Sequence, residues 1–121
     1  MPFTSLDKLL DAVVATTTSE GFNIGDRTKQ SLQFICANRS SGNGVFTVDV
    51  SNDGTNWTAY NRLTSNLANS NVQADTRVAS VTLNANGSNF AFFPEGDHFN
   101  YIRVTVTRTT DGTYSAILSG V

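Results

Sequence analysis

The chain has 121 residues, a formal net charge of −2, and a composition that is 15% charged and 10% aromatic. This length is typical of one domain, residues 1–121, and the aromatic content argues against a disordered chain. Because the eight basic residues are scattered and no apolar run reaches about 18 residues, we expect neither nucleic acid nor a membrane as a partner.

The chain begins with apolar residues at a spacing typical of a helix. Leu6, Leu9 and Leu10 lie three and four positions apart, as on one face of a helical turn. This pattern predicts a short N-terminal arm or helical turn over residues 1–11. A first strand is expected over about 12–18, because its threonines favour an extended chain.

Two segments of alternating apolar and polar residues follow, and each predicts a strand with one buried face. They cover residues 32–37 and 46–51. The sequence Ser-Gly-Asn-Gly at 41–44 joins them and has the composition of a turn. Cys36 is the sole cysteine, and its place in the alternation predicts a small core residue.

A tight hairpin and a long polar segment come next. Asp53-Gly54 is a strong hairpin dipeptide, and the strand after it carries Trp57 and Tyr60. Residues 61–76 are rich in Asn and Ser. Loops of this length are uncommon inside compact domains and are often functional, so this segment is a candidate contact region.

The second half of the chain repeats the pattern of short strands and turns. Strand signals occur over 78–83, 90–93, 101–108 and 114–118, with an Asp-Gly turn at 111–112. Short strands at regular intervals are typical of sandwiches and barrels. The sequence therefore predicts an all-β fold, an antiparallel β-sandwich or jelly roll of seven to eight strands.

Side chains suited to catalysis are sparse. His98 is the only histidine, so any catalytic triad would depend on it. Glu95, Asp97 and His98 could ligate a cation, but they lack the ligand series of a calcium loop and also have ordinary turn composition. We therefore expect a protein that is not an enzyme and that uses neither a cofactor nor a metal.

The segment around Trp57 resembles part of the discoidin-type, galactose-binding-like sandwiches. The resemblance rests on Val-Asp-Val-Ser-Asn-Asp-Gly-Thr-Asn-Trp at 48–57 and Phe-Asn-Tyr-Ile-Arg-Val at 99–104. It implies a domain that binds glycans or lipid headgroups through its loops. In a carbohydrate-binding module, Trp57, Tyr60 and Phe92 would stack on a sugar; the alternative is that Trp57 folds back over the core as an anchor.

A second resemblance covers about residues 12–121. The turn and hairpin at 42–57, and the residues from 101 to the C-terminus, are similar to small structural proteins of tailed bacteriophages. These are compact β-sandwiches, and some serve as head decoration (cement) proteins or tail-associated parts. The resemblance implies a virion protein made in the host cytoplasm, most directly a capsid decoration protein, with a tail or neck component as the alternative within that class.

A decoration protein would act through protein–protein contacts. Its partners would be the major capsid protein or other virion proteins, and it would form a homo-oligomer, with a trimer as one option. We expect the contacts to come from the N-terminal arm through Phe3, Leu6 and Leu10, and from the long polar loop through Leu67 and Val72.

Overall fold

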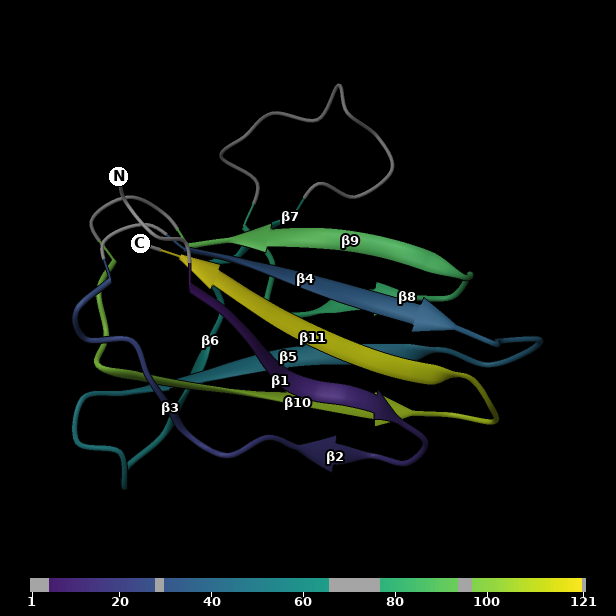
Figure 1. Cartoon of the computed structure of the whole chain (residues 1–121), viewed down its shortest axis with the longest axis horizontal. Coiled ribbons are helices and arrows are strands. Elements are labelled where there is room, and N and C mark those ends of the chain that lie inside the picture. The colour runs from purple at the N-terminus through teal and green to yellow at the C-terminus, as the bar shows by residue number, and fades with distance from the viewer. Residues whose placement is uncertain (1–4, 28–29, 66–76, 94–96, 121) are drawn as a thin grey trace.

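The computed structural model describes residues 5–27, 30–65, 77–93 and 97–120. Within these ranges every regular element is a β-strand, and the strands form two antiparallel sheets that pack face to face (Figure 1). The prediction of an all-β antiparallel sandwich is thus confirmed. In the same ranges no helix has the length and apolarity needed to cross a membrane.

The first sheet, which we call the β4 sheet, is built around two long neighbouring strands. Its order is β1 (Ser5–Val13), β11 (Thr113–Gly120), β4 (Gln30–Ala37), β9 (Gly87–Phe92) and β7 (Thr64–Ser65). β4 and β11 pair without a break from Gln30 to Ala37. Each alternates buried apolar side chains with half-exposed ones, as a sheet with one dry face requires.

The second sheet, the β5 sheet, pairs β5 (Gly44–Ser51) with β10 (Tyr101–Arg108) over their full lengths. Two short strands follow one another along the free edge of β10: β2 (Thr17–Thr18) and β3 (Phe22–Asn23). The free edge of β5 likewise pairs with β6 (Thr58–Tyr60) and β8 (Val81–Leu83). These short edge strands bring the described strands to eleven, above the seven to eight expected.

The expected arm or helical turn over residues 1–11 is wrong where the structure describes it, because residues 5–13 form strand β1. β1 pairs with β11, and its register shifts between Lys8 and Leu10 and again between Leu10 and Val13. Such bulges turn successive side chains to the same side of a strand. Leu10 thereby enters the core, and Leu9 and Val13 pack against it. The helix-like spacing of the leucines reflects these bulges.

Aromatic rings join the two sheets at the centre of the sandwich. Phe34 of β4 stacks on Phe46 of β5, with 4.4 Å between ring centroids, and Tyr114 of β11 meets Phe46 edge-on at 6.0 Å. Gly44 lies directly against the Tyr114 ring, where a Cβ would overlap ring carbons. Cys36 is buried in this core, as its place in the alternation predicts.

Candidate functional site

The residues expected at a protein interface do not form one surface in the described structure. Leu10 is only 3% exposed, so its predicted interface role is wrong: the bulges of β1 direct it into the core. Leu6 lies in β1 opposite Ser119 of β11. Phe3, Leu67 and Val72 fall outside the described residues.

Tyr60 is not available to stack on a sugar. It is 5% exposed, and its ring packs between Phe93 and Phe99, with centroids 5.3 Å away in each case. Its hydroxyl donates a hydrogen bond of 2.5 Å to Asp97. In the β6 register Tyr60 lies opposite Val48, whose side chain faces the core, and this pairing explains the burial.

Trp57 is half-buried on the outside of the β5 sheet. The guanidinium carbon of Arg103 lies 4.5 Å from the ring centroid. On the benzene edge the ring lies close to Gly21, where a Cβ would be 2.8 Å from Cζ2. Trp57 is therefore neither a core residue nor an open stacking platform, because it clamps the β5–β6 connection to β10 and to the segment at Gly21.

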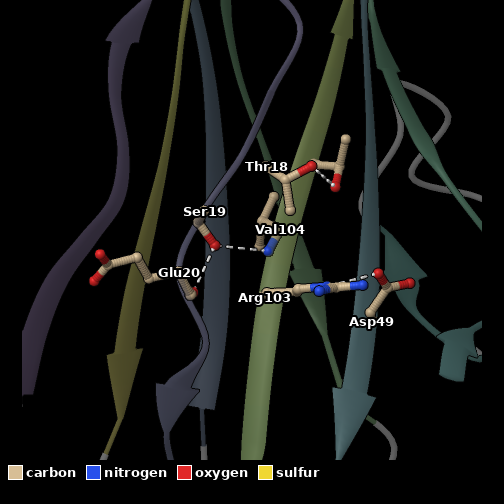
Figure 2. A network of polar contacts seen from close by, with 7 residues as sticks. Thr18, Ser19, Glu20, Asp49, Arg103 and Val104 are labelled. Atoms are coloured by element: carbon tan, nitrogen blue, oxygen red, sulfur yellow. Dashed lines mark hydrogen bonds and ion pairs between the residues drawn. The ribbon is translucent and has the colours of Figure 1, made fainter. Parts of the chain in front are cut away.

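Asp49 of β5, which lies directly opposite Arg103 of β10, holds the Arg103 side chain in place. Its Nε donates to Asp49 Oδ2 at 3.0 Å across the β10–β5 pair (Figure 2). On the other side of β10, Ser19 bonds Val104 twice: its N–H donates to the Val104 carbonyl at 2.8 Å, and its Oγ accepts from the Val104 N–H at 2.9 Å. These contacts fix both neighbours of β10 around the Trp57 clamp.

Phe92 belongs to an exposed aromatic pair on the outer face of the β4 sheet. Phe92 is 42% exposed and Phe90 is 37% exposed, and their rings stack with centroids 6.2 Å apart. The two side chains point outward because Ala91 between them is fully buried. The sequence did not predict Phe90 as a surface contact residue, although the alternation Phe-Ala-Phe at 90–92 could have indicated it.

The three central strands of this sheet, β11, β4 and β9, contain no charged residue. In register with Phe90 and Phe92 lie Gln33 and Ser31 of β4, and beyond them Ile117 and Ser119 of β11. We call this surface the aromatic face; its residues are Ser31, Gln33, Ile35, Ser88, Phe90, Phe92, Ser115, Ile117 and Ser119. Exposed apolar patches often mark protein–protein contacts, and Ile35, Phe90, Phe92 and Ile117 form the apolar part of this face.

A polar cleft of about 700 Å³ is lined by residues at the start of β10 and in β3. It lies between the loop after β3 and the loop after β5. We call it the asparagine cleft, and its lining residues are Phe22, Asn23, Gly25, Asp26, Arg27, Asn52, Asn100 and Tyr101. The sequence gives no sign of this cleft, because its residues come from three separate segments and no motif links them.

Hydrogen bonds among these turns hold the asparagine cleft open. The Asn100 N–H donates to Asn52 Oδ1 at 3.2 Å, and Asn100 Nδ2 donates to the Asn52 carbonyl at 3.1 Å. On the opposite wall, Asn23 Oδ1 accepts from the Gly25 N–H at 2.9 Å. The Ile24 N–H donates to the Asn100 carbonyl at 2.7 Å, which joins the two walls.

Asp97 and His98, the described members of the possible cation site, contact different partners. The Tyr60 hydroxyl and then the Arg62 guanidinium, 3.0 Å from Oδ2, hold the pKa of Asp97 below its ordinary value. His98 Nε2 lies 3.1 Å from the Gly25 carbonyl. In the described ranges no three His, Cys, Asp or Glu residues gather as metal ligands would, and Glu95 lies outside them.

Comparison with known proteins yields a similarity of fold. No protein-family model and no curated protein sequence matches the chain. Among solved structures, the chain is similar to the SPBc2 prophage-derived protein YomS, with a TM-score of 0.70 and 11% sequence identity. The superposition covers 100% of this chain and 96% of that one. At this identity the similarity shows that the two chains share one fold along their whole length.

Proposed function

We propose that the protein is a structural component of a tailed-bacteriophage particle, most directly a capsid decoration protein. The observation that carries the proposal is the fold it shares, end to end, with a prophage-derived protein. The segments at 42–57 and from 101 to the C-terminus, which resemble parts of small phage structural proteins, are consistent with it. In this role the protein acts by binding rather than by catalysis, and its site of action is the virion.

The aromatic face supplies a surface suited to that role. A decoration protein stabilises a head by burying area against the major capsid protein or other virion proteins, and specific interfaces bury about 800 Å² on each partner. Phe90 and Phe92 are exposed and stacked, and the strands beside them present only neutral side chains. The nine residues of the aromatic face are neutral, so burying them leaves no unpaired charge among them. The charges of Lys8, opposite Ile117, and of Arg77, bonded to Thr64 opposite Phe92, lie at its borders. A second copy of the chain, as in a trimer, would use the same apolar area.

Reconstitution of particles tests the proposal. Particles assembled without this protein are mixed with the purified chain and sedimented, and wild-type protein should sediment with them at a saturating number of copies. The double variant Phe90→Ser, Phe92→Ser should remain in the supernatant. Val14→Ser is the matched control, since Val14 is 62% exposed but lies outside the aromatic face.

The position of the bound protein separates the alternatives within the virion class. Heads and tails are purified apart after the wild-type chain has been added. Decoration predicts that the chain is found on heads, whereas binding to tails or necks would assign it there. Wild-type protein that sediments with neither would contradict the proposal.

A further inference from the structure

We infer that the asparagine cleft binds a neutral sugar, namely a pyranose unit of a glycan. The inference goes beyond the proposed virion role, because a decoration protein needs no saccharide site. It rests on the cleft's size, on the polar groups that its internal hydrogen bonds leave available, on its charge, and on the ring of Tyr101. The residues that line the cleft do not include Trp57, Tyr60 or Phe92.

The size of the cleft fits a small ligand. Its volume of about 700 Å³ lies within the range of about 300–1,000 Å³ typical of small-molecule sites. Hydrogen bonds already fix its walls, from Asn100 to Asn52 on one side and from Gly25 to Asn23 on the other. Walls fixed in advance reduce the ordering cost of binding.

The asparagines present both donors and acceptors to the cleft. Asn23 and Asn52 each use the side-chain oxygen to accept a backbone hydrogen bond, so the Nδ2 group of each is the part that can donate to a ligand. Asn100 uses its Nδ2 group internally, which leaves its oxygen as an acceptor. Sugar hydroxyls donate and accept at once, and a mixed set of amide groups matches them.

The charges around the cleft favour a neutral ligand over an anion. Asp26 lines the cleft and is exposed. Arg27, the cation of the lining, forms an ion pair with Asp7 in which Nη2 and Oδ2 are 2.6 Å apart. A phosphate or sulfate would meet the Asp26 carboxylate at close range, whereas a sugar hydroxyl can donate to it.

Tyr101 provides an aromatic surface beside these amides. It lies directly opposite Asn23 in the β10–β3 register, so both side chains project from the same face. Tyr101 is half-exposed, and Gly54 lies against the ring, where a Cβ would be 3.4 Å from it. A ring held in this way can pack against the apolar face of a pyranose while the asparagines bind its hydroxyls.

The test is a titration followed by ¹H–¹⁵N NMR. The probes are the methyl glycosides of glucose, galactose, N-acetylglucosamine and N-acetylgalactosamine, together with their neutral oligosaccharides and a sulfated oligosaccharide. Saturable shifts are expected with at least one neutral probe, in the side-chain amide signals of Asn23 and Asn52. Those signals locate the ligand even if a variant should fail to fold.

The matched variant is Asn23→Asp combined with Asn52→Asp. Aspartate keeps an oxygen that can hold each wall and replaces each Nδ2 donor with a negatively charged oxygen that can only accept, so the fold should persist. We expect the variant to bind the best neutral probe at least about tenfold more weakly, which corresponds to about 1.4 kcal/mol. The control is Asn84→Asp, an exposed residue just after β8, which lies beside the far end of β5 from the cleft.

Several results would overturn the inference. These are no saturable shift at about 10 mM of any neutral probe, tighter binding of the sulfated oligosaccharide, or equal affinity in the paired variant. The outcome is independent of the virion role, since the cleft variant should still sediment with particles. Loss of sugar binding and loss of particle binding are therefore distinguishable.

Discussion

Arg103 lies stacked on Trp57, with its guanidinium carbon 4.5 Å from the ring centroid. Arg103 Nε donates a hydrogen bond of 3.0 Å to Asp49 Oδ2 on the neighbouring strand. Gly21 lies against the benzene edge of the indole. A residue of the β5–β6 connection thus crosses the outside of β10 and fastens the segment between β2 and β3. This clamp belongs to the structure of the edge rather than to a ligand site.

The first prediction concerns the contact between Gly21 and Trp57. A Cβ at Gly21 would lie 2.8 Å from Trp57 Cζ2, so Gly21→Ala must displace the ring. We expect the variant to lower the free energy of unfolding by about 1–3 kcal/mol in urea denaturation, as overpacking does. In a Trp57→Ala background the same change should cost little. An equal cost in both backgrounds would show that Gly21 acts through something other than the ring.

The second prediction concerns alkaline pH. Burial, followed by the hydrogen bond to Asp97, raises the pKa of Tyr60 well above its ordinary value of 10.0. A folded-state pKa above the unfolded one means that the stabilisation is complete below about pH 10 and is lost as the pH rises through the folded-state pKa. Tyr60→Phe should reduce the free energy of unfolding by about 1–3 kcal/mol at neutral pH and flatten the alkaline decline. Urea unfolding of both proteins between about pH 7 and pH 11 checks it.

The third prediction concerns acid pH and two turn carboxylates. The backbone N–H groups of Asn56 and Thr55 lower the pKa of Asp53, and the Ser40 hydroxyl and neighbouring N–H groups lower that of Asp111. Depressed folded-state pKa values stabilise the fold above the ordinary value of 3.8, and this stabilisation is lost as the pH falls through them.

Replacing these carboxylates should therefore weaken the dependence of stability on acid pH. Melting temperatures of Asp53→Asn and Asp111→Asn should fall less than that of the wild type between about pH 5 and pH 2. Parallel curves for all the proteins would contradict the role of the turn hydrogen bonds.

The fourth prediction concerns the aromatic face in the isolated protein. Phe90→Ser and Phe92→Ser replace exposed rings, so each should change the free energy of unfolding by only about 0.5 kcal/mol. If the face also joins copies of the chain, the double variant should shift the sedimentation-velocity profile toward the monomer. Val14→Ser should leave the profile unchanged. If the wild-type protein is a monomer, the aromatic face does not join copies of the chain. The capsid then remains its proposed partner.

The sequence predicted the long strands well, because their alternation and their turns are local signals. β4, β5, β10 and β11 follow from alternating side chains between glycine-containing turns. β1 was mistaken for an arm or helical turn because Leu6, Leu9 and Leu10 have a helical spacing in the sequence, and the strand has bulges at Lys8–Leu10 and Leu10–Val13. A bulge depends on the partner strand, and no local pattern reports it.

The candidate sites were less predictable, since exposure depends on which face of a sheet is covered. Tyr60 and Phe92 both follow strand-like patterns, yet one lies in the core and the other on the surface. The asparagine cleft needs three turns to meet at the start of β10, and this is a property of strand order. Asn23, Asn52 and Asn100 each look like ordinary turn residues in the sequence.

The most direct test of the virion role is quantitative mass spectrometry of particles purified from the phage or prophage that encodes this chain. The proposed role predicts that the chain remains with heads through density-gradient purification, in a fixed ratio to the major capsid protein. A chain that is abundant in the lysate but absent from purified particles would contradict it.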